Sequence, residues 1–192
     1  MTRFWWVRHG PTHEKAFVGW RDVPADLSDI ARIARLDAHL PKGALLVSSD
    51  LVRASATAAA LANGREALPA DPALREINFG AWDGLHWSEA SARDPDLTRA
   101  FWETPGDIAP PDGESWNAVA ARVDGFVAQI LAAHPGRDIV AVAHFGVILT
   151  RVQQAGHLTA EAALAHRVEP LSVTRTEHSA AGWHLGEIGA CP

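Results

Sequence analysis

Short apolar runs recur along this 192-residue chain and predict a series of strands. Two of the runs, at residues 4–7 and 139–143, are continuous, which is typical of strands buried on both faces. Two others, at residues 171–176 and 183–188, are separated by a short turn and predict an antiparallel pair. In chain order, the strands are expected at residues 4–7, 44–47, 67–69, 139–143, 171–176 and 183–188.

Helical stretches fill most of the intervals between these runs. Their apolar positions recur with the period of a helix or lie in alanine-rich sequence that ends at Asn63 and Gly64. The helices are expected at residues 27–40, 51–62, 116–133 and 146–155. The polar residues that we expect to cap the first three of them are Asp26 or Ser28, then Asp50, and then Glu114 with Ser115.

The alternation of strands and helices predicts an α/β fold: a three-layer α/β/α sandwich with a mostly parallel central sheet. Residues 77–112 lack a clear period, contain several tryptophans and are interrupted by prolines. We expect them to form a small inserted cap rather than a separate domain. With 47% hydrophobic residues, residues 1–192 are most simply one domain with this insertion.

Composition and charge narrow the classes of partner. The net charge of −6 argues against nucleic acid or an anionic membrane surface. The sequence has no signal-peptide pattern, and its longest apolar stretch is interrupted by His144, so no membrane span is expected. A single cysteine, Cys191, leaves no intrachain disulfide, which favours a cytoplasmic location. The oligomeric state stays open, and a homodimer is among the alternatives.

The first candidate for chemistry follows the strand at residues 4–7, where the chain reads Arg8-His9-Gly10-Pro11-Thr12. An imidazole and a guanidinium at the end of a strand lie beside a glycine that lets a ligand approach the backbone. The planar guanidinium fits phosphate oxygens, and the threonine adds a hydroxyl. These residues are suited to a histidine that attacks phosphorus. The structural alternative is a strand-end histidine that only bonds to the backbone.

A second histidine changes the balance between these alternatives. His144 also follows an apolar run, at residues 139–143, and it precedes Gly146 by two residues. In open α/β sheets, ligands bind where the carboxyl ends of parallel strands meet helix starts. If both strands are central and parallel, His9 and His144 face the same crevice.

The chain resembles the histidine phosphatase superfamily, in its phosphoglycerate-mutase-like branch. The resemblance depends on the order and combination of short segments that span most of the chain. These segments read RHGPT (8–12), GWRD (19–22), SSDLVRA (48–54), LREINFGAWDG (74–84), GES (113–115) and VAHFG (142–146). Within this family, residues 111–115 are similar to those of the alpha-ribazole phosphatases, which are small bacterial phosphatases.

The resemblance implies a role for each matching residue. His9 would be the nucleophile and form a phosphohistidine, while Arg8, Arg53 and His144 would bind the phosphoryl oxygens with help from Thr12. Such cations stabilise the charge of the transferring group without a metal ion. We expect His144 to be protonated for this purpose.

Glu76 would protonate the leaving oxygen and then activate water, which requires a raised pKa. The residues that we expect to bind phosphate are Arg8, Gly10, Thr12, Arg53 and His144. Neither a metal nor a cofactor is implied.

Departures from the family pattern affect the substrate rather than the reaction. Pro11 stands where an acidic or amide residue is common, Lys15 stands where many members carry asparagine, and residues 25–28 differ from the usual sequence. Whether Lys15, His13 or Glu114 contacts the substrate is open. Core packing explains Trp5, Trp6 and Trp183. For four other tryptophans, a place in the core and a place in the pocket wall are equally compatible with the sequence: Trp82, Trp87, Trp102 and Trp116.

Three functions fit these residues. The preferred one is a metal-independent phosphomonoesterase that acts on a small phosphorylated metabolite. A cofactor-dependent phosphoglycerate mutase would use the same residues, but it usually has longer insertions. A binding module without catalysis would not need a nucleophile or an acid.

Overall fold

A single six-stranded sheet organises the chain, which is described over residues 1–192 by a computed structural model. The strand order is β3-β2-β4-β1-β5-β6. The strands are β1 (Thr2–Arg8), β2 (Leu45–Ser48), β3 (Glu66–Ala67), β4 (Asp138–Ala143), β5 (Val173–Ser179) and β6 (Gly182–Leu185). β1 through β4 run parallel, whereas β5 is antiparallel to β1 and β6 is antiparallel to β5. The mostly parallel sheet and all six predicted strands are confirmed.

Seven α-helices and two 3-10 turns accompany the sheet. The α-helices are α1 (Ile30–His39), α2 (Val52–Ala60), α3 (Trp87–Arg93), α4 (Pro95–Glu103), α5 (Trp116–Ala133), α6 (Phe145–Gly156) and α7 (Ala160–Leu164). The 3-10 turns are η1 (Pro72–Leu74) and η2 (Gly80–Trp82). Helix α5 has the predicted bounds, whereas the five-residue α7 was not predicted.

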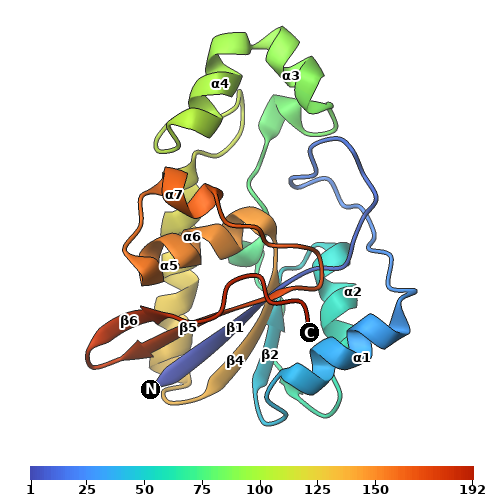
Figure 1. Cartoon of the computed structure of the whole chain (residues 1–192), viewed down its shortest axis with the longest axis vertical. Coiled ribbons are helices and arrows are strands. Elements are labelled where there is room, and N and C mark those ends of the chain that lie inside the picture. The colour runs from blue at the N-terminus through green and yellow to red at the C-terminus, as the bar shows by residue number, and fades with distance from the viewer.

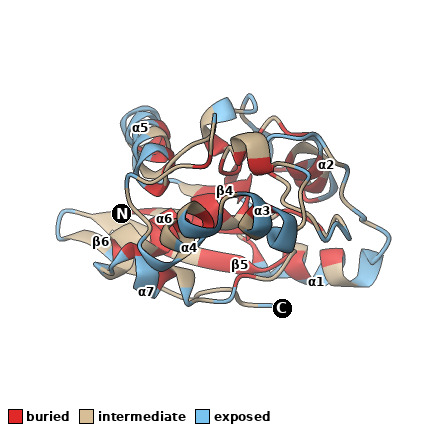
Figure 2. Ribbon diagram, turned by 90° about the horizontal axis from the view of Figure 1, so that it is seen from above, coloured by how far each residue is buried: buried red, intermediate tan, exposed pale blue.

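Alternating side chains of the central strands divide the core into two layers, because successive residues of a strand point to opposite faces. Phe4, Trp6 and Ile139 pack with residues of α5 and α6. Val7 and Val140 pack with residues of α1 and α2 on the other face. The three-layer arrangement is therefore confirmed. Figure 2 shows the buried residues concentrated in the strands and the inner faces of the helices.

The segment between η2 and α5 projects away from the sheet. Figure 1 shows its two helices, α3 and α4, beyond the carboxyl ends of β1 and β4. The capping box of His86 and Glu89 begins α3, and Pro95 occupies the first turn of α4, where its missing N–H costs nothing. None of the helices is long and apolar enough to cross a membrane.

Two of the expected helix caps are wrong. Helix α1 begins three residues later than predicted, and Asp29 caps it by accepting from the amide of Arg32. Asp50 does not cap α2, because its carboxylate pairs with Arg75.

The residue that replaces Asp50 is Asp22, which is 30 positions before Val52 in the sequence. Its Oδ1 accepts from the amide of Val52 at 2.7 Å. The predicted cap Ser115 does accept from the amide of Ala118 at 3.1 Å and begins α5. A cap that comes from a distant loop has no local sequence pattern, and it can be found only in the folded chain.

Candidate active site

The two strand-end histidines meet at one edge of the sheet. Strands β1 and β4 are parallel neighbours, with Arg8 opposite Ala143, so the next residue of each chain segment is His9 or His144. The ring centroids of these histidines are 4.9 Å apart. The expectation that the two histidines lie together is confirmed, but only His9 lines the pocket at this edge, because His144 is fully buried. A pocket of about 230 Å³ opens here, and its walls include Arg8, His9, Thr12 and Glu76.

His9 is held as a neutral imidazole. The residue is 6% exposed, and its Nδ1 lies 2.7 Å from the carbonyl oxygen of Gly10. Burial, with the nearby charges of Arg53 and Arg8, lowers the pKa of His9 to about 3, although the bond to Gly10 opposes this shift. Because a carbonyl oxygen only accepts, Nδ1 carries the proton. The other ring nitrogen, Nε2, therefore keeps the lone pair that a nucleophile needs.

His144 carries its proton on the opposite nitrogen. Its Nδ1 accepts from Nε of Arg53 at 3.2 Å, so in the neutral ring Nε2 holds the hydrogen. This Nε2 is buried and has no partner within the protein. Burial first, and the adjacent His9 ring and the charge of Arg53 next, hold the pKa of His144 well below its usual range. The expected protonated His144 is therefore corrected to a neutral N–H donor.

The two arginines occupy different places in the site. Arg8 lines the pocket and donates through Nη1 to the carbonyl oxygen of Val168 at 2.7 Å, while its Nε has no partner. Arg53 is fully buried behind His144 and donates through Nη2 to the carbonyl oxygen of Gly19 at 2.6 Å. Arg53 does not line the pocket. Its direct contact with a phosphoryl group stays a prediction.

Gly10 and Thr12, which were both expected to bind phosphate, occupy different places in the structure. Thr12 is in the pocket wall, whereas Gly10 is not. The amide of Gly10 donates to Oγ1 of Thr57 at 3.0 Å, so the structure does not offer this amide to phosphate. What Gly10 provides is close packing, because a Cβ at this position would lie 2.6 Å from Cδ2 of Leu27.

Glu76 is a buried carboxyl that faces the same pocket as His9. Its Oε1 accepts from the amides of Ile77 and Gly146, each at 2.9 Å. Burial raises the pKa of Glu76, even though these two bonds and the charges of Arg53 and Arg8 favour the carboxylate. A raised pKa lets the carboxyl hold its proton at a higher pH than an ordinary glutamate does and lose it during a reaction.

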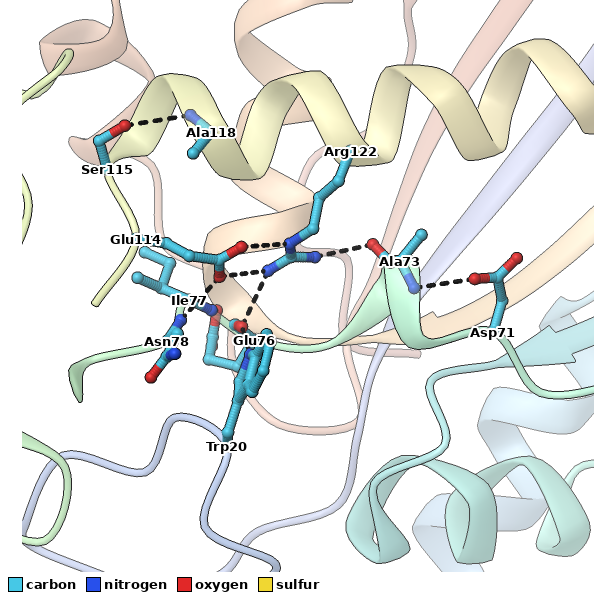
Figure 3. A network of polar contacts seen from close by, with 10 residues as sticks. All are labelled: Trp20, Asp71, Ala73, Glu76, Ile77, Asn78, Glu114, Ser115, Ala118 and Arg122. Carbon is cyan, nitrogen blue, oxygen red and sulfur yellow. Dashed lines mark hydrogen bonds and ion pairs between the residues drawn. The ribbon is translucent and has the colours of Figure 1, made fainter. Parts of the chain in front are cut away.

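Arg122 of α5 fixes the backbone on either side of Glu76, as Figure 3 shows. Its guanidinium donates to the carbonyl oxygens of Ala73 at 2.7 Å and Glu76 at 2.9 Å. The same group pairs with Glu114, whose Oε2 accepts from the amide of Asn78 at 2.9 Å. Glu114 thus acts in the support of Glu76 and does not line the pocket. The sequence gave no indication of this role for Arg122, because a polar position on a predicted helix does not show which distant residues its side chain contacts.

Gly146 is required for the position of the Glu76 carboxyl. A Cβ at Gly146 would lie 2.6 Å from Oε1 of Glu76 and 2.6 Å from Cγ1 of Ile77. We therefore expect Gly146→Ala to displace the carboxyl and to lower kcat on alkyl phosphates about 100-fold, the cost of a misplacement of about 1 Å. The measurement is steady-state hydrolysis together with a thermal melt.

The matched control is Gly125→Ala, because nothing lies within 4 Å of a Cβ at Gly125 in α5. This variant should keep the wild-type kcat. A Gly146→Ala protein with native melting temperature and unchanged kcat would show that the carboxyl does not depend on Gly146.

The structure shows which of the residues that the sequence left undecided line the pocket. Trp102 lines the pocket, Trp82 and Trp116 are buried in the core, and Trp87 is exposed. His13 is exposed and pairs with Asp26. Lys15 is exposed and outside the pocket wall. Three aromatic residues of the wall were missed, because their segments come together only in the fold: Phe17, Phe79 and Phe145.

Comparisons with known proteins agree with this geometry. The family model described as the histidine phosphatase superfamily (branch 1) matches residues 4–190. A bifunctional protein of Mycobacterium tuberculosis is 38% identical over 128 residues, which cover 66% of this chain and 33% of that protein. This chain therefore spans about a third of the length of that relative.

Two further proteins match over most of their lengths. The adenosylcobalamin/alpha-ribazole phosphatase of Escherichia coli is 28% identical over 174 residues, covering 87% of this chain and 85% of that protein. The structure of YhfR from Bacillus stearothermophilus superposes with a TM-score of 0.89 at 28% identity, over 98% of this chain and 97% of that one. The resemblance seen in the sequence is confirmed.

Proposed function

The chain belongs to the histidine phosphatase superfamily (branch 1), and on this premise we propose that it is a metal-independent phosphomonoesterase. It hydrolyses a small phosphorylated metabolite through a phosphohistidine on His9. The observation that carries the proposal is the pair of opposite tautomers. His9 keeps a free lone pair on Nε2, while His144, 4.9 Å away between ring centroids, presents an N–H donor.

In the first step, Nε2 of His9 attacks phosphorus and a P–N bond forms. The P–O bond to the alcohol breaks, and its electron pair goes to the leaving oxygen. The protonated carboxyl of Glu76 gives its proton to this oxygen, so the product leaves as a neutral alcohol. Arg8, the Nε2–H of His144 and the hydroxyl of Thr12 stabilise the negative charge of the transferring oxygens.

In the second step, the carboxylate of Glu76 takes a proton from water as the water oxygen attacks phosphorus. The P–N bond breaks and its electron pair returns to Nε2 of His9. Inorganic phosphate leaves, and both His9 and the protonated Glu76 are restored. A single carboxyl with a raised pKa serves both steps, which supports hydrolysis over a role in binding alone.

A phosphohistidine is the direct test of this proposal. Rapid acid-free quenching of the protein with a ³²P-labelled ester should leave label on His9 that is lost in acid and stable in alkali. Label on a serine or aspartate, or no label during active turnover, would overturn the covalent step.

Chelators are expected to leave the activity unchanged. The charge of the transferring group is met by Arg8, His144 and Thr12, so no metal ion is needed for the reaction. The measurement is phosphate release before and after dialysis against EDTA, with a metal-dependent phosphatase as the positive control. A loss of activity that one added metal restores would contradict the proposed mechanism.

The proposed partner and cellular location are inferred from the residues of this chain rather than from its relatives. The partner is a small phosphorylated substrate, because the pocket is about 230 Å³ and drug-sized ligand sites span roughly 300–1,000 Å³. The single Cys191 is consistent with a cytoplasmic protein. The net charge of −6 is consistent with a protein that binds neither nucleic acid nor membranes.

A further inference from the structure

We propose that the substrate is a phosphate monoester of an uncharged alcohol that carries an aromatic ring, selected by the pocket against alcohols that carry a carboxylate. This inference rests on the proposed function and adds the class of substrate. It depends on the side chains that surround the leaving group, which lie outside the phosphate-binding residues.

Aromatic side chains form the part of the pocket wall that lies beyond the residues that we expect to bind the phosphoryl group. Phe17, Phe79, Trp102 and Phe145 all line the pocket. Phe17 and Trp102 are stacked with an interplanar angle of 11° and centroids 6.1 Å apart, and Phe17 and Phe79 are 4.8 Å apart. Apolar faces of this kind bind planar apolar groups by burial and by offset or edge contacts. They offer few partners to a polyhydroxylated alcohol.

Four separate parts of the chain contribute this wall. Trp102 comes from α4, beyond the carboxyl ends of the central strands. Phe145 follows His144 at the start of α6, and its ring lies 5.5 Å from the Arg8 guanidinium. The ring of Phe145 therefore lies beside Arg8, which we expect to bind the phosphoryl group. An aromatic alcohol would continue this apolar surface directly from the phosphoryl group.

Charge in the pocket disfavours a second anion on the substrate. Arg8 is the only lysine or arginine in the wall, and the phosphoryl group uses it. Glu14 is also in the wall, where it pairs with Arg21 at 2.9 Å. Arg53 is buried, and the exposed Lys15 is outside the wall. A carboxylate on the alcohol would therefore meet Glu14 and find no free cation.

Matched substrates test the inference. Benzyl phosphate, 4-carboxybenzyl phosphate and propyl phosphate all have poor alkyl leaving groups, so their rates differ through binding rather than leaving-group chemistry. We expect kcat/KM for benzyl phosphate to exceed that of the other two at least about tenfold, a factor that corresponds to about 1.4 kcal/mol. Equal values, or a preference for the carboxylated ester, would overturn the inference.

Variants separate the two causes. Trp102→Ala should lower the ratio of kcat/KM for benzyl over propyl phosphate about tenfold. Glu14→Gln should raise kcat/KM for the carboxybenzyl ester about fivefold, because it removes a like charge near the surface. The control is Trp87→Ala, which changes a 63% exposed cap tryptophan outside the wall and should leave both ratios unchanged. If native-like Trp102→Ala kept the wild-type ratio, the aromatic wall would not select the substrate.

Non-hydrolysable ligands distinguish failure of this inference from failure of the proposed function. Calorimetric titration with benzylphosphonate and 4-carboxybenzylphosphonate measures the same preference without turnover. A tenfold lower Kd for benzylphosphonate in a protein that hydrolyses no ester would retain the preference of the pocket for an aromatic ring and reject the phosphatase. Equal Kd values in an active phosphatase would retain the enzyme and reject the substrate class.

Discussion

His9→Ala is expected to lower kcat/KM for every phosphate monoester by on the order of 10⁴–10⁶, the loss seen when a nucleophile is removed from an enzyme. No other group can take its place, because the neighbouring His144 has its hydrogen, not its lone pair, on the unpartnered nitrogen. The measurement is phosphate release from an aryl and an alkyl ester with EDTA present.

The control for His9→Ala is His13→Ala. His13 is four residues away, exposed, and paired only with Asp26, so its loss should leave kcat/KM within about twofold of wild type. Melting curves of both variants should resemble that of the wild type. Substantial phosphate release by a folded His9→Ala protein would remove His9 as the nucleophile.

Glu76→Gln is expected to separate substrates by their leaving groups. Alkyl esters leave as alkoxides unless they are protonated, so their kcat should fall about 10²–10⁴-fold, the usual contribution of a general acid. Esters of an activated phenol, which leave without a proton, should lose much less in the first step. The measurement is a plot of log kcat against leaving-group pKa, which should be steeper for Glu76→Gln than for wild type.

The pH profile gives a second readout of the same variant. Because burial raises the pKa of Glu76 and the acid form is needed, wild-type activity on alkyl esters should be lost as the pH rises through this pKa. Because the pKa of His9 is lowered to about 3 and the neutral ring is needed, no loss is expected near pH 6.5 on the acidic side. Glu76→Gln should remove the loss at high pH. Equal losses on both substrate types, with an unchanged profile, would exclude Glu76 as the acid.

Most of the fold could be predicted because its signals are local. Continuous apolar runs identified the central strands β1 and β4, and the helical period of residues 116–133 gave the bounds of α5. The residues at which helices begin were harder to predict. The cap of α1 was mistaken because both Asp26 and Asp29 near its start can accept from an amide. The cap of α2 was mistaken because Asp50 pairs with Arg75, and Asp22 from a distant loop accepts from Val52 instead.

The sequence by itself determined the reacting groups of this protein: an arginine and a histidine at the end of one apolar run, a second histidine at the end of another, and the ordered segments of a known family. Consecutive residues suffice for such patterns, since strands end and glycines turn by local rules. These local patterns therefore predict that His9 and His144 meet.

Only the tertiary structure decided the states of these groups. Burial sets the protonation of His9, His144 and Glu76, and burial is the sum of contacts from every element packed around a side chain. The same holds for the place of Arg53 behind His144 and for the aromatic wall, whose members come from four segments. Side chains that are distant in sequence become neighbours only when the sheet, the helices and the loops pack together.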